Sequence, residues 1–241
     1  MWVKFFIIQK TKAIFAVLKL HVLVGPFESF LLNLAYLSKQ SRWINQTSKQ
    51  LAYNDFFSGD RRREKRLDLY THIQRNYIGE GPIDYLEFGV AQGGSFFWWM
   101  EHHTHPEARF FGFDTFTGLP EDYGPFKKGD MGHGLGIPAT SDPRASFYQG
   151  LFQQTLPGFL SQFPNHRQKV IHLDADLYTA TLYTLTTLAP YLRSGDIILF
   201  DEFCVPTHEF LAYKNFSESF YVDWEPIAAS NNFLFTAFRV K

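Results

Sequence analysis

Four acidic residues follow two short apolar segments of the chain. The segments are Val-Ile-His-Leu, which ends in Asp174 and Asp176, and Ile-Ile-Leu-Phe, which ends in Asp201 and Glu202. If the segments are neighbouring strands, these carboxylates converge at one edge of a sheet and repel each other unless a cation intervenes. Oxygen ligands favour Mg²⁺, with Ca²⁺ or Mn²⁺ as alternatives. Such an ion can bind a substrate oxygen and lower its pKa, and a remaining carboxylate can remove the proton. Asp176 also precedes an expected helix, so capping of that helix is the structural alternative.

A glycine-rich turn is the second feature that could do chemistry. Residues 86–95 are Leu-Glu-Phe-Gly-Val-Ala-Gln-Gly-Gly-Ser, and they lead from an expected strand into an expected helix. Glycines let the backbone approach a ligand closely, and the helix N-terminus offers free N–H groups to a carboxylate. Asp114 ends the next strand, where a carboxylate can accept hydrogen bonds from both hydroxyls of a ribose. The turn lacks the G-x-G-x-x-G spacing of dinucleotide sites, and the charge of Glu87 suits the ammonium of a methionine group. This pattern favours S-adenosylmethionine over a nicotinamide cofactor.

Short apolar runs alternate with helical stretches around these residues. We expect strands at 83–88, 109–113, 145–149, 170–173, 196–200, 224–228 and 233–240. We expect helices from the glycine-rich turn to about 103, at 179–192 and at 208–220. Another helix should begin near Ser58–Asp60, whose side chains can cap it, and end before Gly79. Strands separated by helices predict an α/β fold with a Rossmann-like, seven-stranded, mainly parallel sheet and helices on both faces. Such sheets bind ligands beyond the carboxyl ends of their strands, where both groups of candidate residues lie.

Residues 1–57 are predicted to form a helical extension outside the catalytic domain, which we place at 58–241. Lysines, Pro26 and Glu28 interrupt the apolar segments, so no stretch reaches the roughly 18 uninterrupted apolar residues of a transmembrane helix. Lys19 falls within the apolar region that a secretory signal would need. We expect amphipathic helices that pack on the domain or join two copies in a homodimer. Membrane contact is not expected, and peripheral contact is the alternative.

The overall charge excludes one class of partner. A net charge of −1 and a pI near 6.8 give no electrostatic attraction to nucleic acid. The basic run Arg61–Arg66 is interrupted and flanked by acids, so we expect it to form the solvated face of a helix. The single cysteine, Cys204, excludes an internal disulfide and a cysteine zinc cluster, which favours a reducing compartment, the cytoplasm.

At these motifs the chain resembles the macrocin O-methyltransferase family. Members are class I enzymes that methylate sugar hydroxyls of antibiotics with S-adenosylmethionine and Mg²⁺. The resemblance covers roughly residues 80–205, and its most specific part pairs the glycine-rich turn with Phe-Asp-Thr-Phe-Thr-Gly-Leu-Pro at 113–120. It implies a Rossmann-like methyltransferase that belongs to natural-product biosynthesis.

The resemblance also implies roles for individual residues. The expected cofactor-binding residues are Glu87, Gly89, Gly93, Ser95, Asp114 and Thr115. Among them, Glu87, Gly89 and Ser95 would hold the methionine end, and Asp114 the ribose. The expected metal ligands are Asp174, Asp201 and Glu202, and Asp176 would be the general base. The family has two aspartates where this chain has Asp201-Glu202, and the longer glutamate would shift the ion or leave the site metal-poor.

Residues 120–143 form a long, glycine-rich segment. Long loops over active sites often act as lids that order when a substrate binds. His133 lies in this segment, and we expect it to reach the substrate as a second acid or base. An incidental histidine in a mobile loop is the alternative.

Three functions follow from these features. The first is metal-assisted methyl transfer to a hydroxyl of a small molecule, such as a sugar or a natural product. The second is a metal-dependent glycosyltransferase, because Asp174-Ala175-Asp176 is an Asp-x-Asp motif, although that reaction does not account for Glu87 or Asp114. The third is a non-catalytic module that binds the cofactor or assembles through its N-terminal helices. The motifs favour the first.

Overall fold

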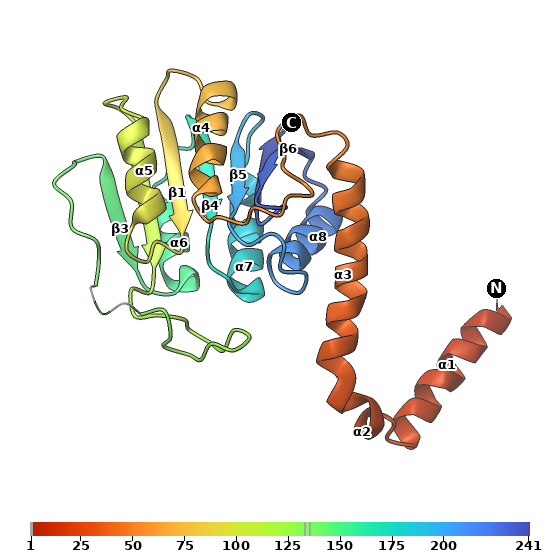
Figure 1. Ribbon diagram of the computed structural model, residues 1–241. Coiled ribbons are helices and arrows are strands. Elements are labelled where there is room, and N and C mark those ends of the chain that lie inside the picture. Colours follow the sequence, from red (N-terminus) through yellow and green to blue (C-terminus); the bar gives the residue numbers. More distant parts are fainter. Residues whose placement is uncertain (1, 133, 135) are drawn as a thin grey trace.

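The computed structural model describes residues 2–132, 134 and 136–241 (Figure 1). Within these residues, seven strands form one sheet in the order β3-β2-β1-β4-β5-β7-β6. The strands are β1 (Ile83–Phe88), β2 (Arg109–Asp114), β3 (Ala145–Gln149), β4 (Gln168–Leu173), β5 (Ile197–Phe200), β6 (Trp224–Ser230) and β7 (Phe235–Val240). Strands β1 to β5 run parallel, and β7 is antiparallel to both β5 and β6. The predicted sheet is confirmed, and its order reverses between β1 and β4, beside the glycine-rich turn.

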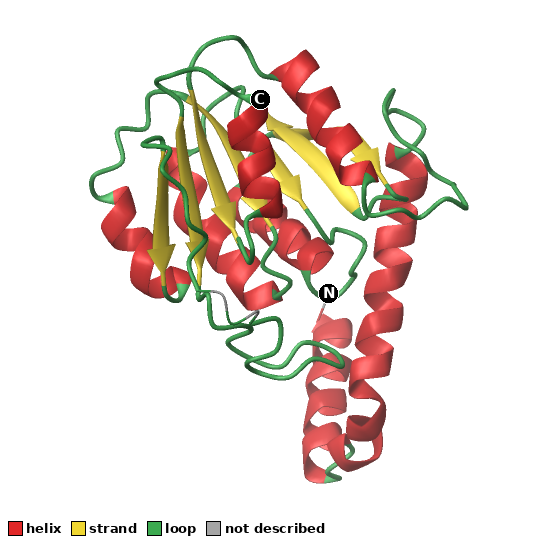
Figure 2. Ribbon diagram, turned by 60° about the vertical axis from the view of Figure 1, so that its left-hand side comes forward, coloured by secondary structure: helices red, strands yellow, loops and turns green. Residues whose placement is uncertain are grey.

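Helices cover both faces of this sheet (Figure 2). Helices α4 (Lys65–Tyr77) and α5 (Gly94–His102) pack on one face, and α6 (Phe152–Leu160), α7 (Tyr178–Leu188) and α8 (Glu209–Phe220) on the other. Strand side chains alternate between the faces, so Tyr85 stacks on Trp99 of α5 while Phe88 contacts Phe152 of α6. A short 3₁₀ turn, Ala189–Tyr191, extends α7. Burial on both faces fits the uninterrupted apolar sequence of β5, Ile-Ile-Leu-Phe.

The sequence placed the start of one helix wrongly and did not predict another. Helix α4 begins at Lys65 rather than at Ser58–Asp60, and its N-cap Glu64 makes no side-chain cap bond. The Ser58 hydroxyl instead accepts a hydrogen bond from the Asp60 N–H, 3.1 Å away, and Lys65 Nζ pairs with Asp55 at 2.6 Å. These local side-chain bonds compete with a helical start, so the segment stays irregular. Helix α6 was not predicted, because it is short and contains a proline.

The N-terminal helices form an arm that projects from the domain (Figure 1). The arm consists of α1 (Trp2–Val17), α2 (His21–Val24), the 3₁₀ turn η1 (Gly25–Phe27) and α3 (Glu28–Thr47). The end of α3 packs on the β6–β7 edge, where Ile44 contacts Ala229 and Phe233. Of the two predicted placements, packing on the domain is not observed for residues 4–37, whose described apolar side chains are mostly exposed, and packing against a second copy stays a prediction. Among the described residues no single helix is long and apolar enough to cross a membrane. The pair Lys4–Val17 and His21–Thr47, bent by 76°, meets that test together by length and composition alone.

Candidate active site

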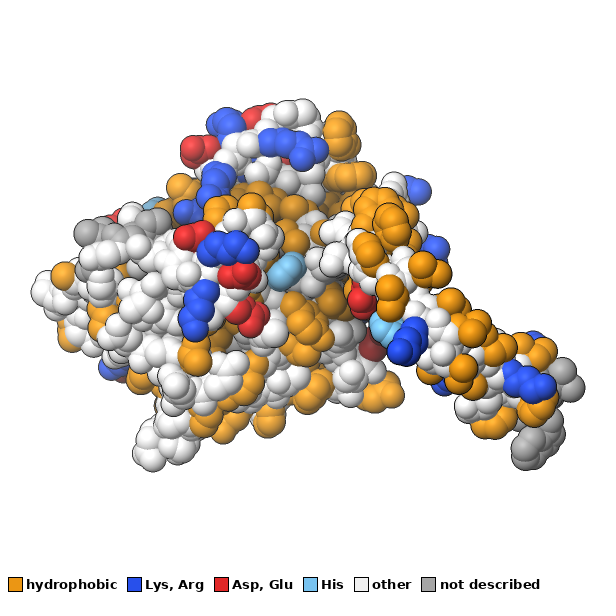
Figure 3. All heavy atoms as spheres, turned by 90° about the horizontal axis from the view of Figure 1, so that it is seen from below, with side chains coloured by type: hydrophobic (Ala, Val, Ile, Leu, Met, Phe, Trp, Pro, Cys, Tyr) orange, Lys and Arg blue, Asp and Glu red, His pale blue; other side chains and the backbone are white. Residues whose placement is uncertain are grey.

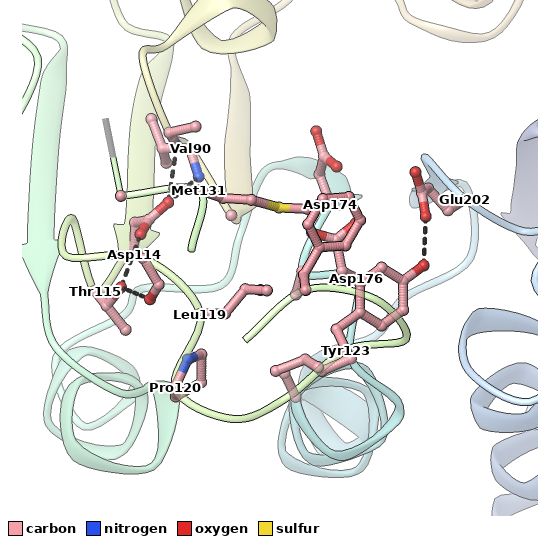
Figure 4. A pocket seen from close by; sticks show the side chains of 18 of the residues that line it. Val90, Asp114, Thr115, Leu119, Pro120, Tyr123, Met131, Asp174, Asp176 and Glu202 are labelled. Atoms are coloured by element: carbon pink, nitrogen blue, oxygen red, sulfur yellow. Dashed lines mark hydrogen bonds between the residues drawn. The ribbon is translucent and has the colours of Figure 1, made fainter. Parts of the chain in front are cut away.

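A cavity of about 1230 Å³ opens at the carboxyl ends of the parallel strands (Figure 4). Single-ligand pockets measure roughly 300–1,000 Å³, so this one has room for a cofactor and an acceptor together. The predicted site residues that line it are Glu87, Gly89, Ser95, Asp114, Thr115, Asp174, Asp176 and Glu202. Gly93 and Asp201 are not among the lining residues. His133 lies outside the described residues, and its role stays a prediction.

The turn after β1 requires glycine at two positions. Gly89 has a φ of +98°, and a Cβ there would lie 1.8 Å from the carbonyl oxygen of Asp174. Its N–H donates to the carbonyl of Phe113 at 2.9 Å. At Gly93, with a φ of +84°, a Cβ would lie 2.6 Å from the ring of Phe97. The turn is thus held tightly between β2 and β4, with bare backbone toward the cavity.

Asp114 holds the glycine-rich turn from the opposite side. One of its carboxylate oxygens, Oδ2, accepts hydrogen bonds from the N–H groups of Val90 and Ala91, both at 2.8 Å (Figure 4). The other oxygen accepts the Phe116 N–H at 2.7 Å. The Thr115 hydroxyl donates to the carbonyl of Gly118 at 2.7 Å, which shapes the segment that follows. Asp114 is therefore fixed at the cavity wall, where its remaining lone pairs can meet a ligand.

A buried polar network lies beneath the cofactor side of the cavity. The Tyr85 hydroxyl donates to Glu87 at 2.5 Å and contacts His172 Nδ1 at 3.0 Å. On the far side of the ring, His172 Nε2 lies 3.2 Å from the Tyr70 hydroxyl, which lies 3.2 Å from Ser95 Oγ. Burial favours neutral His172, but the carboxylates of Asp201 and Glu87 outweigh it and raise the pKa of His172 to about 10. The network holds Glu87 and Ser95 in place, and its members on α4, β1 and β4 are too far apart in sequence to reveal it.

The acidic edge brings together part of the predicted metal set. Ligand atoms of His172, Asp174 and Asp201 all lie within 4.8 Å of one another. Asp201 is buried, and neither of its carboxylate oxygens has a hydrogen-bond partner among the described residues. Burial, followed by the charge of Asp201, raises the pKa of Asp174 well above its usual value. A buried carboxylate without hydrogen bonds is costly, so this pair suits a bound cation.

Two arginines of the predicted solvated run lie near this edge. Arg63 is solvated as predicted, with its side chain 71% exposed, whereas Arg66 is mostly covered, and both line the cavity. Their guanidinium groups lie 4.0 Å and 3.9 Å from Asp201. Arg66 also reaches α5, with Nη2 3.7 Å from the position that a Cβ on Gly94 would occupy. The sequence does not indicate that these arginines reach the cavity, because their positions depend on where α4 begins.

Asp176 points into the cavity from the turn before α7 (Figure 4). Its φ of +59° is in the left-handed region, which aspartate tolerates better than most residues. The capping alternative is not observed, because His208 Nδ1 accepts the Tyr178 N–H at 3.2 Å and α7 has no side-chain cap bond. Burial, followed by the charges of Glu202 and Asp201, raises the pKa of Asp176 to about 7.

Glu202 lies outside the group of His172, Asp174 and Asp201, although it lines the same cavity. Its carboxylate accepts a hydrogen bond of 2.6 Å from the hydroxyl of Tyr123, which belongs to the segment after β2 (Figure 4). A second tie joins Glu121 of this segment to the hydroxyl of Thr179, at 2.7 Å. Burial and Glu202 raise the pKa of Tyr123, so its hydroxyl remains a donor. Part of the predicted lid is therefore bonded to the acidic edge.

Comparison with known families identifies the domain that carries this site. Residues 86–203 match the family model described as a methyltransferase domain. This part of the chain is a methyltransferase domain. The match runs from β1 to just beyond β5 and so contains the glycine-rich turn, Asp114 and the acidic edge.

Two proteins of named activity are similar to this chain in sequence. One is the 8-demethyl-8-(2,3-dimethoxy-alpha-L-rhamnosyl)-tetracenomycin-C 4'-O-methyltransferase of Streptomyces olivaceus, 28% identical over 163 residues, which cover 58% of this chain and 61% of the relative. The other is the mycinamicin III 3''-O-methyltransferase of Micromonospora griseorubida, 25% identical over 171 residues, or 59% of this chain and 64% of the relative. The chain thus spans less than two thirds of the length of these relatives. Both are named O-methyltransferases, and the predicted resemblance is confirmed.

Solved methyltransferases share the fold. The calicheamicin methyltransferase CalS11 aligns with a TM-score of 0.59 at 21% identity, covering 83% of this chain and 92% of its own. The O-methyltransferase NovP aligns with a TM-score of 0.58 at 22% identity, and the alignment covers 73% of this chain and 80% of NovP. The predicted Rossmann-like methyltransferase fold is confirmed.

Proposed function

We propose that this chain is an S-adenosylmethionine-dependent O-methyltransferase that methylates a hydroxyl of a sugar or another natural product, assisted by Mg²⁺. The observation that carries this proposal is the cavity itself. One end holds the bare backbone of the glycine-rich turn with Glu87 and Asp114, and the other holds Asp174, Asp176 and Glu202. Such a cavity can align a hydroxyl with a methyl donor and exclude water, which is most of what methyl transfer requires.

The cofactor end has the donors and acceptors that S-adenosylmethionine needs. The buried carboxylate of Glu87 would bind the ammonium, and the N–H groups that begin α5, with Arg66 beside them, would bind the methionine carboxylate. Asp114 would bind the ribose hydroxyls while it continues to hold Val90 and Ala91. When bound, the cofactor supplies an activated methyl group on a positively charged sulfur.

The acidic end has the properties of a metal site. Asp174 and Asp201 would hold Mg²⁺, and Glu202 is the third candidate ligand from the same edge. Both carboxylate oxygens of Asp201 accept no hydrogen bond among the described residues, which supports this assignment. Protonated His172 would serve as a fixed positive charge between Glu87 and Asp201 rather than as a ligand. Mg²⁺ at this place would orient the acceptor oxygen and lower its pKa.

Asp176 is the residue best placed to take the proton. It faces the cavity next to the acidic edge, and its side chain makes no cap bond to the start of α7. Its carboxylate would accept the proton of the acceptor hydroxyl. Positioned bases of this kind contribute about 10²–10⁴-fold to rate.

The test is methyl transfer by the purified chain with S-adenosylmethionine, Mg²⁺ and a panel of nucleotide-linked sugars and glycosylated natural products. Release of S-adenosylhomocysteine and the mass of the product report turnover. Asp176→Asn should lower kcat by about 100-fold or more while cofactor binding is unchanged. Asp223→Asn, a solvent-exposed acid far along the chain, is the matched control. Normal turnover of Asp176→Asn would remove the base role, and transfer of the sugar instead of a methyl group would establish the glycosyltransferase alternative.

A further inference from the structure

The arm exposes an unusual number of large apolar side chains. Between residues 5 and 37 the exposed ones are Phe5, Phe6, Ile7, Ile8, Ile14, Phe15, Val17, Leu18, Val22, Leu23, Val24, Phe27, Phe30, Leu31, Leu32, Leu34 and Leu37. The tip, defined here as residues 17–27, includes Leu23 at 70% and Val17 at 77% exposure. Exposed apolar surface on this scale marks an interaction site.

The apolar side chains of α1 surround the helix. Phe5, Phe6, Ile7 and Ile8 are consecutive, so they point in four directions about 100° apart, and each is more than half exposed. A protein partner that packs on one face would leave the other faces in water. Hydrocarbon can surround a helix on all sides, and this distribution therefore favours lipid as the occupant.

The charge of the arm selects the kind of lipid surface. Residues 1–27 contain four lysines and no aspartate or glutamate, and the first acidic residue is Glu28. These lysines would repel one another across an interface between two arms. They would instead attract a surface that carries anionic headgroups, while their long stems remain in contact with hydrocarbon.

The tip and the mouth of the cavity face the same side of the molecule. In Figures 1 and 2 the arm extends in the direction in which the parallel strands end, and the segment after β2 lies on that side in both views. Asn33 of α3 borders the cavity, which places the arm beside it. Seen from this side, apolar and basic side chains cover much of the arm, and acidic and basic side chains are mixed on the face of the domain (Figure 3). Phe126, Met131 and Ile137 add exposed apolar side chains on the segment after β2.

We propose that the arm docks on a lipid surface with anionic headgroups, with residues 17–27 inserted in one leaflet and the cavity mouth facing the membrane. The 76° bend between α1 and the helices that follow suits an arm that enters and leaves the same leaflet. If the proposed methyltransferase function holds, the acceptor is then a hydroxylated group attached to a lipid, presented at the membrane surface. This proposal replaces the expectation from sequence that the helices avoid membranes.

Flotation of the full chain with vesicles tests the docking. We expect the protein to float with vesicles that contain phosphatidylglycerol and to float several-fold less with pure phosphatidylcholine. Leu23→Glu and Phe27→Glu should each reduce flotation by about tenfold or more, because they place a charge among acyl chains. Tyr221→Glu, at a residue 88% exposed on the main domain, is the matched control and should float like the unaltered chain.

Other outcomes overturn the docking proposal without touching the methyltransferase proposal. S-adenosylhomocysteine binding, measured on the same samples, reports the cofactor site and should be equal in all variants. Absence of flotation with either vesicle, or unchanged flotation of both tip variants, contradicts docking. A stable dimer that Leu23→Glu converts to a monomer, without any vesicle binding, would show that a second copy covers the arm instead.

The orientation needs a separate measurement. In a Cys204→Ser background, Lys128→Cys places a fluorophore on the cavity side, and Glu80→Cys places one before β1, at the opposite end of the sheet. Both positions are exposed. Brominated lipids should quench the label at 128 and leave the label at 80 nearly unaffected. Equal quenching at the two positions would contradict a cavity that faces the membrane.

Discussion

The hydroxyl of Tyr123 donates a 2.6 Å hydrogen bond to the carboxylate of Glu202. This bond joins the segment after β2 to the acidic edge, and it occupies an oxygen of Glu202 that a metal ion would need. If Mg²⁺ binds here as proposed, this bond competes with the ion for the Glu202 carboxylate.

Removal of the Tyr123 hydroxyl should release Glu202. We predict that Tyr123→Phe binds Mg²⁺ up to about tenfold more tightly, since a hydrogen bond to a charged group contributes about 1.5 kcal/mol. Calorimetric titration of Mg²⁺ in the presence of S-adenosylhomocysteine measures the change, with Tyr221→Phe as the control. Unchanged Mg²⁺ affinity would mean that Glu202 takes no part in metal binding.

Gly89→Ala should disable the cofactor site. Its Cβ would lie 1.8 Å from the carbonyl oxygen of Asp174, and its φ of +98° disfavours any L side chain. The turn must shift, so we predict a loss of S-adenosylhomocysteine affinity of about 100-fold or more, equivalent to about 2.7 kcal/mol. Gly81→Ala, where nothing lies within 4 Å of a Cβ, should bind the cofactor normally. Equal affinities for the two variants would show that the turn does not approach the ligand.

Asp201→Asn should remove the effect of Mg²⁺ on the protein. The unaltered chain is expected to melt at a higher temperature when Mg²⁺ is added, because ligand binding to the folded state stabilises it. The neutral amide keeps the size of Asp201 but not the charge that holds the ion, so Mg²⁺ should no longer raise the melting temperature. Differential scanning fluorimetry with Mg²⁺ and with chelator measures it, and Asp223→Asn should keep the increment. A full Mg²⁺ increment in Asp201→Asn would exclude Asp201 as a ligand.

Glu209 should make the stability fall as the pH rises. Burial raises the pKa of this carboxyl to about 8, while the Thr181 hydroxyl at 2.7 Å opposes the shift. The folded state therefore holds the proton more tightly than the unfolded state. The contribution of Glu209 to the free energy of unfolding is complete below pH about 4.5 and is lost as the pH rises through about 8. Relative to Glu209→Gln, the free energy of unfolding should fall by up to about 1.4 kcal/mol per pH unit in this window and then level off.

Urea unfolding of both proteins across this pH range measures the difference. Glu218→Gln, an exposed glutamate on the same helix, should parallel the unaltered chain at every pH. Curves for Glu209→Gln that also run parallel to the unaltered chain would place the pKa of Glu209 near its usual value.

The features that sequence predicted correctly are local ones. Apolar runs bounded by turns predicted all seven strands to within a few residues, and the glycine spacing predicted the tight turn that Gly89 and Gly93 form. The acidic residues were expected to converge because they follow parallel strands, and Asp174 and Asp201 do so.

The features that sequence missed depend on contacts between distant segments. His172 meets Tyr85 because β1 pairs with β4, and it meets Tyr70 because α4 packs on these strands. Arg66 reaches the cavity from the first turn of α4. The bond between Glu202 and Tyr123 was missed because nothing in the segment of Glu202 indicates a partner 79 residues away. The arm was predicted to pack on the domain or on a second copy, because apolar composition indicates burial without identifying what covers the surface.

Calorimetric titration of S-adenosylhomocysteine into the purified chain tests the central claim most directly. We predict stoichiometric binding that Gly89→Ala weakens by about 100-fold or more and Gly81→Ala preserves, with no binding of a uridine-diphosphate sugar under the same conditions. Binding of the nucleotide sugar, with none of S-adenosylhomocysteine in the presence or absence of Mg²⁺, would contradict the methyltransferase assignment of this cavity.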